Sequence, residues 1–121
     1  MIRLLLKDIL TFREQLDKAT GVRDVGLIES AVNAPFQTFG GKFLYPDVDE
    51  RAARLFFGLV KNHGFIDGNK RVALHALTVY LKIYGVKLNC SQAECVSVTM
   101  NVAASQMSRE GFLIWLRQHI D

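Results

Sequence analysis

The side chains best suited to chemistry lie within nine residues, His63-Gly-Phe-Ile-Asp-Gly-Asn-Lys-Arg71. This segment brings together one imidazole, one carboxylate and two cations. The imidazole of His63 is the one group among them that can take up a proton near neutral pH. A hydroxyl that attacks phosphorus needs such an acceptor, so we expect His63 to act as a general base.

The two cations of this segment, Lys70 and Arg71, fall in the first turn of the helix predicted to follow it. Free backbone N–H groups at a helix start favour anions, and two cations there cost up to about 1 kcal/mol, which a bound phosphate would offset. Gly68 lets the backbone approach a ligand closely, and the side chain of Asn69 can donate two hydrogen bonds to it. The pattern therefore predicts a phosphate site made by Gly68, Asn69, Lys70 and Arg71.

The carboxylate of Asp67 fits the same site, because nucleotide phosphates usually carry Mg²⁺, which binds one or two carboxylates and the phosphate oxygens. Asp67 is the predicted metal ligand. The segment is not a Walker A loop, since Lys70 is followed by Arg71 and not by Ser or Thr. Taken singly, His63 would be a helix cap, Asp67 a turn residue and the two cations a solvated helix start. Their combination favours a nucleotide-phosphate site with its own base.

Apolar residues recur at three- and four-residue spacing in six segments, which predicts six helices. These run from Leu4 to Thr20, between Asp24 and Pro35, from Asp47 to about Asn62, from Lys70 to Gly85, from Ser91 through Val102, and onward from about Ser108. The helix that ends at Gly85 is apolar on nearly every side, so it is predicted to be central and buried. We expect a single all-α domain over residues 1–121.

Paired glycines and aromatic residues between Phe36 and Tyr45 predict a turn with two short extended arms, a small flap on the helical bundle. Phe36, Phe39 and Phe43 could clamp a segment of a target protein against this flap. Packing of the same rings beneath it is equally compatible with the pattern.

The chain has 121 residues, of which 50% are apolar and 22% charged, so it has the composition of one globular domain and not of a disordered segment. Its net charge of +3 comes from scattered basic residues, which argues against direct nucleic-acid binding. Lys7, Asp8 and Arg13 interrupt the apolar N-terminal stretch, which excludes a membrane span there, and no secretory cleavage site follows.

The two cysteines, Cys90 and Cys95, have no histidine nearby, so we expect neither a zinc site nor a disulfide between them. A reducing, cytoplasmic location fits this expectation. His75 and His119 are assigned to packing.

The run His63-x-Phe65-x-Asp67-Gly68-Asn69-Lys70-Arg71 resembles the signature of the Fic/Doc proteins. Lys70 stands where AMP-transferring Fic members carry a second glycine, and this resembles the Doc branch. The resemblance extends over essentially the whole chain, through Gly21-Val-Arg-Asp24, Phe39-Gly-Gly41 and Tyr45-Pro46. Gly64 replaces a proline of many members, which we expect to loosen the loop, and Val72 replaces a common threonine.

The resemblance implies a type II toxin that transfers the γ-phosphate of ATP, with Mg²⁺, to a Ser or Thr hydroxyl of a protein, elongation factor Tu in this family. His63 would be the base, Asp67 the Mg²⁺ ligand, and Gly68 to Arg71 the phosphate holders. A Phd-like antitoxin would lie across the cleft, and no inhibitory Ser/Thr-x-x-x-Glu-Gly stretch of the Fic type occurs in the chain. The alternatives are Fic-like adenylyl transfer and a catalytically silent antitoxin-binding protein or co-repressor.

Overall fold

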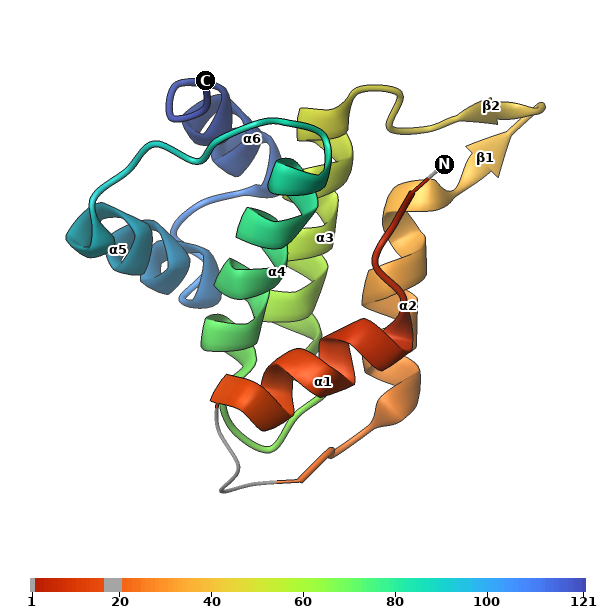
Figure 1. Cartoon of the computed structure of the whole chain (residues 1–121), viewed down its shortest axis with the longest axis vertical. Helices are drawn as coiled ribbons and strands as arrows, with labels where there is room; N and C mark the ends of the chain where they lie inside the picture. Colours follow the sequence, from red (N-terminus) through yellow and green to blue (C-terminus); the bar gives the residue numbers. More distant parts are fainter. Residues whose placement is uncertain (1, 17–20) are drawn as a thin grey trace.

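Helices make up most of the computed structural model, which describes residues 2–16 and 21–121 (Figure 1). Over these ranges the elements are α1 (Leu6–Leu16), α2 (Val25–Asn33), the 3-10 helix η1 (Ala34–Phe36), β1 (Thr38–Phe39), β2 (Lys42–Phe43), α3 (Val48–Asn62), α4 (Asn69–Ile83), α5 (Gln92–Ala103) and α6 (Arg109–Arg117). The predicted all-α bundle with a small extended flap is confirmed. The last part of the first predicted helix, residues 17–20, lies outside the described residues.

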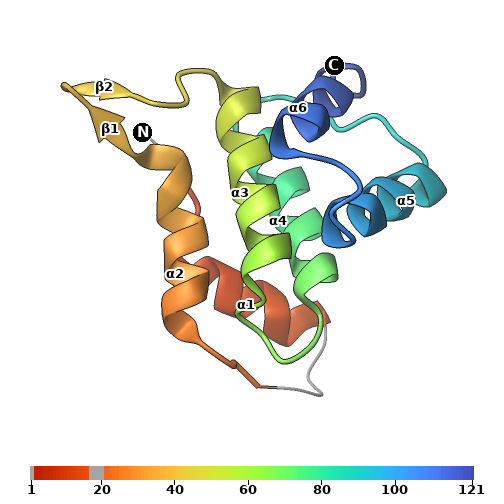
Figure 2. The ribbon, with the colours of Figure 1, turned by 180° about the vertical axis from the view of Figure 1, so that it is seen from behind.

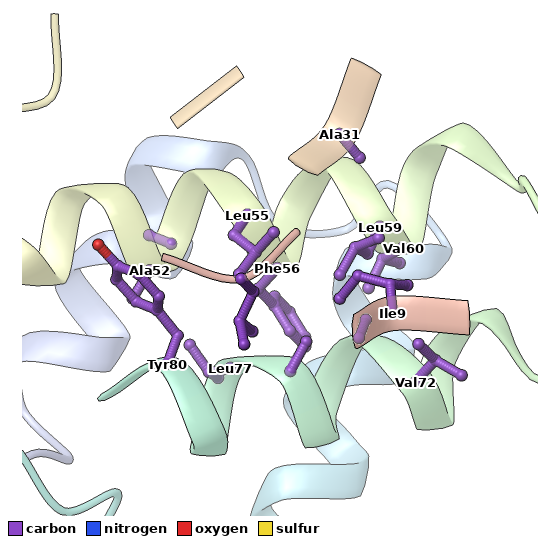
Figure 3. Packing of buried hydrophobic residues seen from close by; sticks show 14 of the residues in the cluster. Ile9, Ala31, Ala52, Leu55, Phe56, Leu59, Val60, Val72, Leu77 and Tyr80 are labelled. Atoms are coloured by element: carbon purple, nitrogen blue, oxygen red, sulfur yellow. The ribbon is translucent and has the colours of Figure 1, made fainter. Parts of the chain in front are cut away.

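Helix α3 lies at the middle of the bundle, in contact with α2, α4, α5 and α6. Its Leu55, Phe56 and Leu59 point into the layer that it shares with α4 (Figure 3). The predicted central helix, α4, is indeed buried along one side, but its Thr78 and Lys82 face solvent. The centre of the fold is therefore the α3–α4 pair, and α3 contacts more of the other elements.

Local sequence signals set the helix boundaries as predicted. The Asp24 side chain accepts hydrogen bonds from the first backbone N–H groups of α2. Capping boxes begin α3 at Asp47 and α5 at Ser91. Gly85, at φ 73°, follows the end of α4 in the left-handed conformation that glycine adopts most easily.

The flap is a two-stranded antiparallel hairpin in which Phe39 pairs with Lys42 across a turn of two glycines with positive φ. Its aromatic residues divide between the two predicted arrangements: Phe36 packs against Tyr80, while Phe39 is 81% exposed. The hairpin lies at the opposite end of α3 from the loop before α4 (Figures 1 and 2). A helix of 15 residues is about 22 Å long, so the flap does not border the predicted site.

A buried arginine ties the flap to the bundle. The guanidinium of Arg51 donates to the Tyr80 hydroxyl at 3.0 Å and to the carbonyls of Pro46 and Tyr45 at 2.7 and 3.2 Å. Burial raises the pKa of Tyr80, and the hydrogen bond from Arg51 acts in the opposite direction. The chain that returns from the hairpin is thus held by hydrogen bonds as well as by packing.

The prediction that the cysteines are unpaired is wrong, because the structure joins Cys90 and Cys95 in a disulfide. Ser91 caps α5 in an extended conformation, which turns Cys90 back over the first turn of that helix. The two Cα atoms lie 6.1 Å apart, within the range that a disulfide spans. Over the described part of the chain, no helix has the length and apolar character needed to cross a membrane.

Reduction of this disulfide is expected to lower the free energy of unfolding by about 2 kcal/mol, because the bond restricts a short loop in the unfolded chain. Urea unfolding with and without dithiothreitol measures the difference. The double variant C90S/C95S should give one curve in both conditions. Coincident curves for the wild-type chain would show that its thiols are free.

Candidate active site

The loop between α3 and α4 is paired with the chain segment that precedes α2. The Gly64 carbonyl accepts hydrogen bonds from the backbone N–H groups of Arg23 and Asp24 at 2.9 and 3.0 Å. Next to it, Val22 and Phe65 form an antiparallel bridge. The loop is therefore fixed by main-chain hydrogen bonds from a segment about 40 residues earlier in the chain.

Arg23 also holds the residue that carries the candidate base. Its Nε donates to the His63 carbonyl at 2.8 Å, and its guanidinium reaches the carbonyl of Asn62 at 3.4 Å. A cation is favourable at this point because both carbonyls belong to the C-terminal end of α3. His63 ends the helix in the left-handed conformation, at φ 51° and ψ 48°, with its side chain exposed.

The expectation that Gly64 loosens the loop is wrong, because Gly64 is buried directly against α2. A Cβ at this position would lie 2.2 Å from Cγ1 of Ile28 and 3.2 Å from the Ile28 backbone nitrogen. Glycine thus allows a close contact between the loop and the helix, and the side chain of Ile28 occupies the space where residue 64 would carry its own.

The side chain of Asn69 closes the loop from the other end. Its Oδ1 accepts from the Phe65 backbone N–H at 3.0 Å, and its Nδ2 donates to the Phe65 carbonyl at 2.9 Å. Phe65 itself points into the core, as predicted. The expectation that the Asn69 amide donates two hydrogen bonds to a ligand is therefore wrong: one donor is engaged within the loop. Its backbone N–H still lies at the start of α4.

The predicted site residues all line one pocket of about 560 Å³. They form its polar wall: His63, Asp67, Gly68, Asn69, Lys70 and Arg71. A second wall comes from α5, which lies beside α4 (Figure 1). Two apolar residues close in sequence to the polar ones, Ile66 and Leu74, complete the lining. These further lining residues are Ile66, Leu74, Gln92, Val96, Thr99 and Met100. The volume is within the range of small-molecule sites.

The charges of the polar wall are arranged at the beginning of α4. Gly68, at φ 82°, is the N-cap of the helix, and its N–H donates to Oδ1 of Asp67 at 2.8 Å. Arg71 reaches the carbonyl of Leu16 at the end of α1 at 3.3 Å. Within the described ranges, Lys70 has no carboxylate at salt-bridge distance. Together with the free N–H groups of the first turn, this cation makes the polar wall suited to an anion.

The pocket fits a magnesium-bound phosphate through a single carboxylate, that of Asp67. Over the part of the chain that the structure describes, no group of three or more metal-ligating side chains occurs. Asp67 is exposed and lines the pocket beside Gly68, Lys70 and Arg71. One carboxylate is sufficient for Mg²⁺, which keeps waters and takes phosphate oxygens as its other ligands. Asp67 is therefore the residue that would hold the ion.

The wall contributed by α5 was not predicted from the sequence. Gln92, Val96 and Met100 recur every four residues and so share one face of the helix. The apolar pattern alone did not separate this face from the buried face, which carries Val98 and Val102. The sequence does carry one signal for this wall, since α5 has apolar residues on two of its faces.

The two other histidines, His75 and His119, lie outside the pocket. His75 packs edge-on against Phe12 with 4.6 Å between the ring centroids, and His119 stacks on Trp115. Both are assigned to packing, as predicted, and neither lines the pocket.

A sequence model of the Fic/DOC family matches residues 3–81, which include the whole loop and nearly all of α4. The chain belongs to the Fic/DOC family. It is also 45% identical over 67 residues to a curated protein named Toxin Doc from Mycolicibacterium smegmatis, a match that covers 55% of this chain and 52% of the relative. The chain thus spans about half the length of the curated relative that it matches. The predicted membership of the family is confirmed.

The Fic/DOC chain carries Val72 where the signature commonly has threonine. Val72 is buried among apolar residues and does not line the large pocket. The absence of a hydroxyl at this buried position therefore leaves the polar wall of this Fic/DOC site complete.

Adding a methyl group at Gly64 is expected to destabilise the fold by about 1–3 kcal/mol, because it overpacks the contact with Ile28. In the matched control Gly21→Ala the nearest atom is 4.0 Å away, so the change should stay within about 0.5 kcal/mol. Denaturant unfolding measures both. In an Ile28→Ala background, Gly64→Ala should cost less than in the wild-type chain, and equal costs would argue against the contact.

Asn69 and Lys70 are neighbours in the chain but are expected to contribute very differently to the stability of the loop. Asn69→Ala removes both hydrogen bonds to Phe65 and should cost about 1–3 kcal/mol of folding stability. Lys70→Ala removes an exposed side chain and should leave stability within about 0.5 kcal/mol of the wild type. Amide hydrogen exchange at the loop gives an independent measure. A stable Asn69→Ala variant with unchanged exchange would contradict this role.

Proposed function

We propose that this chain is a Doc-like toxin of a type II toxin–antitoxin system that transfers the γ-phosphate of ATP to a Ser or Thr hydroxyl of a cytoplasmic protein. One observation carries the proposal: a single pocket places an imidazole, a carboxylate and cations around the start of one helix. The name of the relative from Mycolicibacterium smegmatis supports the toxin part. Resemblance to the family supports elongation factor Tu as the target.

In this proposal the N-terminus of α4 holds the phosphates. Backbone N–H groups of its first turn donate to phosphate oxygens, and Lys70 and Arg71 balance the charge that develops as the γ-phosphoryl group moves. Asp67 would hold Mg²⁺, which when bound neutralises phosphate charge and orients the terminal phosphate. Gly68 leaves the main chain accessible to the ligand.

His63 takes the proton of the target hydroxyl. The hydroxyl oxygen then forms a bond to the γ-phosphorus while the bond from that phosphorus to the β–γ bridging oxygen breaks, and ADP leaves. The imidazolium later releases its proton to solvent. Because Arg23 and the left-handed turn fix the backbone at His63, the imidazole is held at the pocket wall.

Two alternatives remain distinguishable from phosphoryl transfer. Adenylyl transfer would use the same base, and Lys70 in place of a second signature glycine argues against it by family resemblance. The alternative of a catalytically silent antitoxin-binding protein rests on the departures from the family signature at Gly64 and Val72. Neither residue removes a group from the polar wall of the pocket. In either toxin reading, a Phd-like antitoxin supplied in trans would restrain the enzyme by covering the pocket.

Replacing the base is expected to slow the reaction strongly without preventing nucleotide binding. His63→Ala should lower the rate of phosphate transfer by about 10²- to 10⁴-fold. The measurement is incorporation of label from γ-labelled ATP into purified elongation factor Tu and into a translation extract. His119→Ala, which changes a histidine outside the pocket, is the matched control and should keep full activity.

The label that appears decides between the alternatives. Incorporation from α-labelled ATP would replace phosphoryl transfer by adenylyl transfer. No label from either nucleotide, combined with normal growth of cells that express the chain without an antitoxin, would favour the silent binding protein.

A further inference from the structure

The disulfide before α5 joins two cysteines that differ in their access to solvent. Cys90 precedes the helix and is partly exposed, whereas Cys95, in the first turn, is 8% exposed. Thiol–disulfide exchange begins when a thiolate attacks one sulfur of a disulfide, so access decides which sulfur is attacked. An external thiol therefore reaches the sulfur of Cys90 first.

The sulfur that this attack releases lies at the start of a helix. When the S–S bond breaks, its electron pair stays on Cys95 as a thiolate, in the first turn of α5. The N-terminal end of a helix favours negative charge. The carboxylate of the same turn, that of Glu94, is directed elsewhere: it accepts from the Ser91 N–H at 3.0 Å and lies 3.7 Å from Nε2 of His119. The pair thus combines an accessible sulfur with a suitable leaving group.

Helix α5 does not need the disulfide to keep its place. Val98 and Val102 hold the helix in the core, where they are 4% and 0% exposed. Its first turn has a complete capping box, in which Ser91 and Glu94 each accept a hydrogen bond from the backbone of the other. Reduction would therefore leave the helix folded.

The connection that carries Cys90 has anchors of its own. Leu88 and Ile120 form an antiparallel bridge, and the Asn89 N–H donates to the His119 carbonyl at 2.6 Å. The C-terminal segment therefore holds this connection whether or not the cysteines are joined. With both sides anchored, the two thiols of a reduced chain stay close to each other, which favours renewed oxidation.

The short loop between the cysteines makes reduction accessible as well. The stabilisation that a disulfide provides grows with the length of the loop that it closes, and these cysteines are only five residues apart. By thermodynamic linkage, a fold stabilises a disulfide by as much as the disulfide stabilises the fold. A bond that contributes little to folding is correspondingly easy to reduce, so the folded chain can adopt both states.

We propose that Cys90 and Cys95 form a reversible exchange site for low-molecular-weight thiols of the glutathione class. One such thiolate bonds to Sγ of Cys90, while the bond to Cys95 breaks and its electron pair remains on Cys95. A second thiolate attacks the small-molecule sulfur of this mixed disulfide and releases the Cys90 thiolate. Two small thiols are oxidised to their disulfide, the protein disulfide gains two electrons, and the cysteines take up the two protons that the small thiols lose. Oxidation of the chain is the reverse.

The redox state of this site sets the order of the first α5 turn. In the oxidised chain the disulfide ties this turn to the anchored connection, and in the reduced chain the turn is held by its cap and its packing. Helix ends open more readily than buried helix interiors. Gln92 lies between the two cysteines and lines the large pocket, so the site is coupled to the edge of that pocket.

A redox titration of the full wild-type chain tests the exchange. The chain is equilibrated at a series of ratios of reduced to oxidised glutathione, its thiols are alkylated, and mass spectrometry counts the modified cysteines. Both cysteines should change from disulfide to thiol within the series, with one curve from either starting state and unchanged helix content by circular dichroism. A chain that stays oxidised until it unfolds, or one that never becomes oxidised, would overturn the proposal.

Single variants identify the attacked sulfur. With oxidised glutathione, Cys95→Ser should gain one glutathione at Cys90. In the matched variant Cys90→Ser, the remaining thiol is buried and should react at least about tenfold more slowly. Equal rates would overturn the assignment of Cys90 as the sulfur that is attacked.

Amide hydrogen exchange measures the order of the helix start. The N–H groups of Glu94 and Cys95 donate to Ser91 at 3.1 and 3.0 Å, and they should exchange on the order of tenfold faster in the reduced chain. The internal control is α6, where the Phe112 N–H donates to the cap residue Ser108 at 2.9 Å in a helix that has no disulfide. Equal exchange of the α5 amides in both states, or an equal loss of protection in α6, would overturn the coupling to the first α5 turn.

Discussion

The site depends on the close contact between the loop before α4 and the start of α2. Gly64 has no side chain, so its backbone reaches Ile28, and its carbonyl accepts two main-chain hydrogen bonds. A loop fixed at this point holds the His63 backbone on one side and the beginning of α4 on the other. If the contact opened, the imidazole of His63 and the cationic start of α4 would no longer be held at a constant distance from each other.

This contact is supported by groups that are not themselves at the ligand. Arg23 binds the last carbonyls of α3, and Asn69 closes the loop onto Phe65. Phe65 anchors the loop in the core. A family signature residue such as Asn69 thus has a structural task in this fold, and its loss is expected to reduce function through disorder of the loop.

The pocket lies where three helices meet, and each contributes a different kind of group. The C-terminal end of α3 carries the imidazole, the N-terminal end of α4 carries the two cations and the free N–H groups, and α5 adds an apolar face. The hairpin lies at the other end of α3 (Figure 2). A target protein that contacted both the exposed Phe39 and His63 would have to extend over roughly the length of α3, about 22 Å.

The disulfide also lies at the start of the α5 wall, since Cys95 is in the first turn of that helix. It joins the connection between α4 and α5 to the helix that lines the pocket. Reducing conditions, such as those of the cytoplasm, would leave α5 held by its buried face and by its capping box.

The sequence by itself determined the six helices, their caps and the members of the polar wall. These follow from local chemistry: Asp24 and Ser91 cap helices through groups two or three residues away, and the site residues are neighbours in one short segment. Only the tertiary structure decided the roles of Gly64 and Asn69, the pairing of the cysteines, the position of the flap and the wall of α5. The physical reason is that each of these depends on where one chain segment is placed against another, as Ile28 is against Gly64, and periodicity in a single segment carries no record of its neighbours in space.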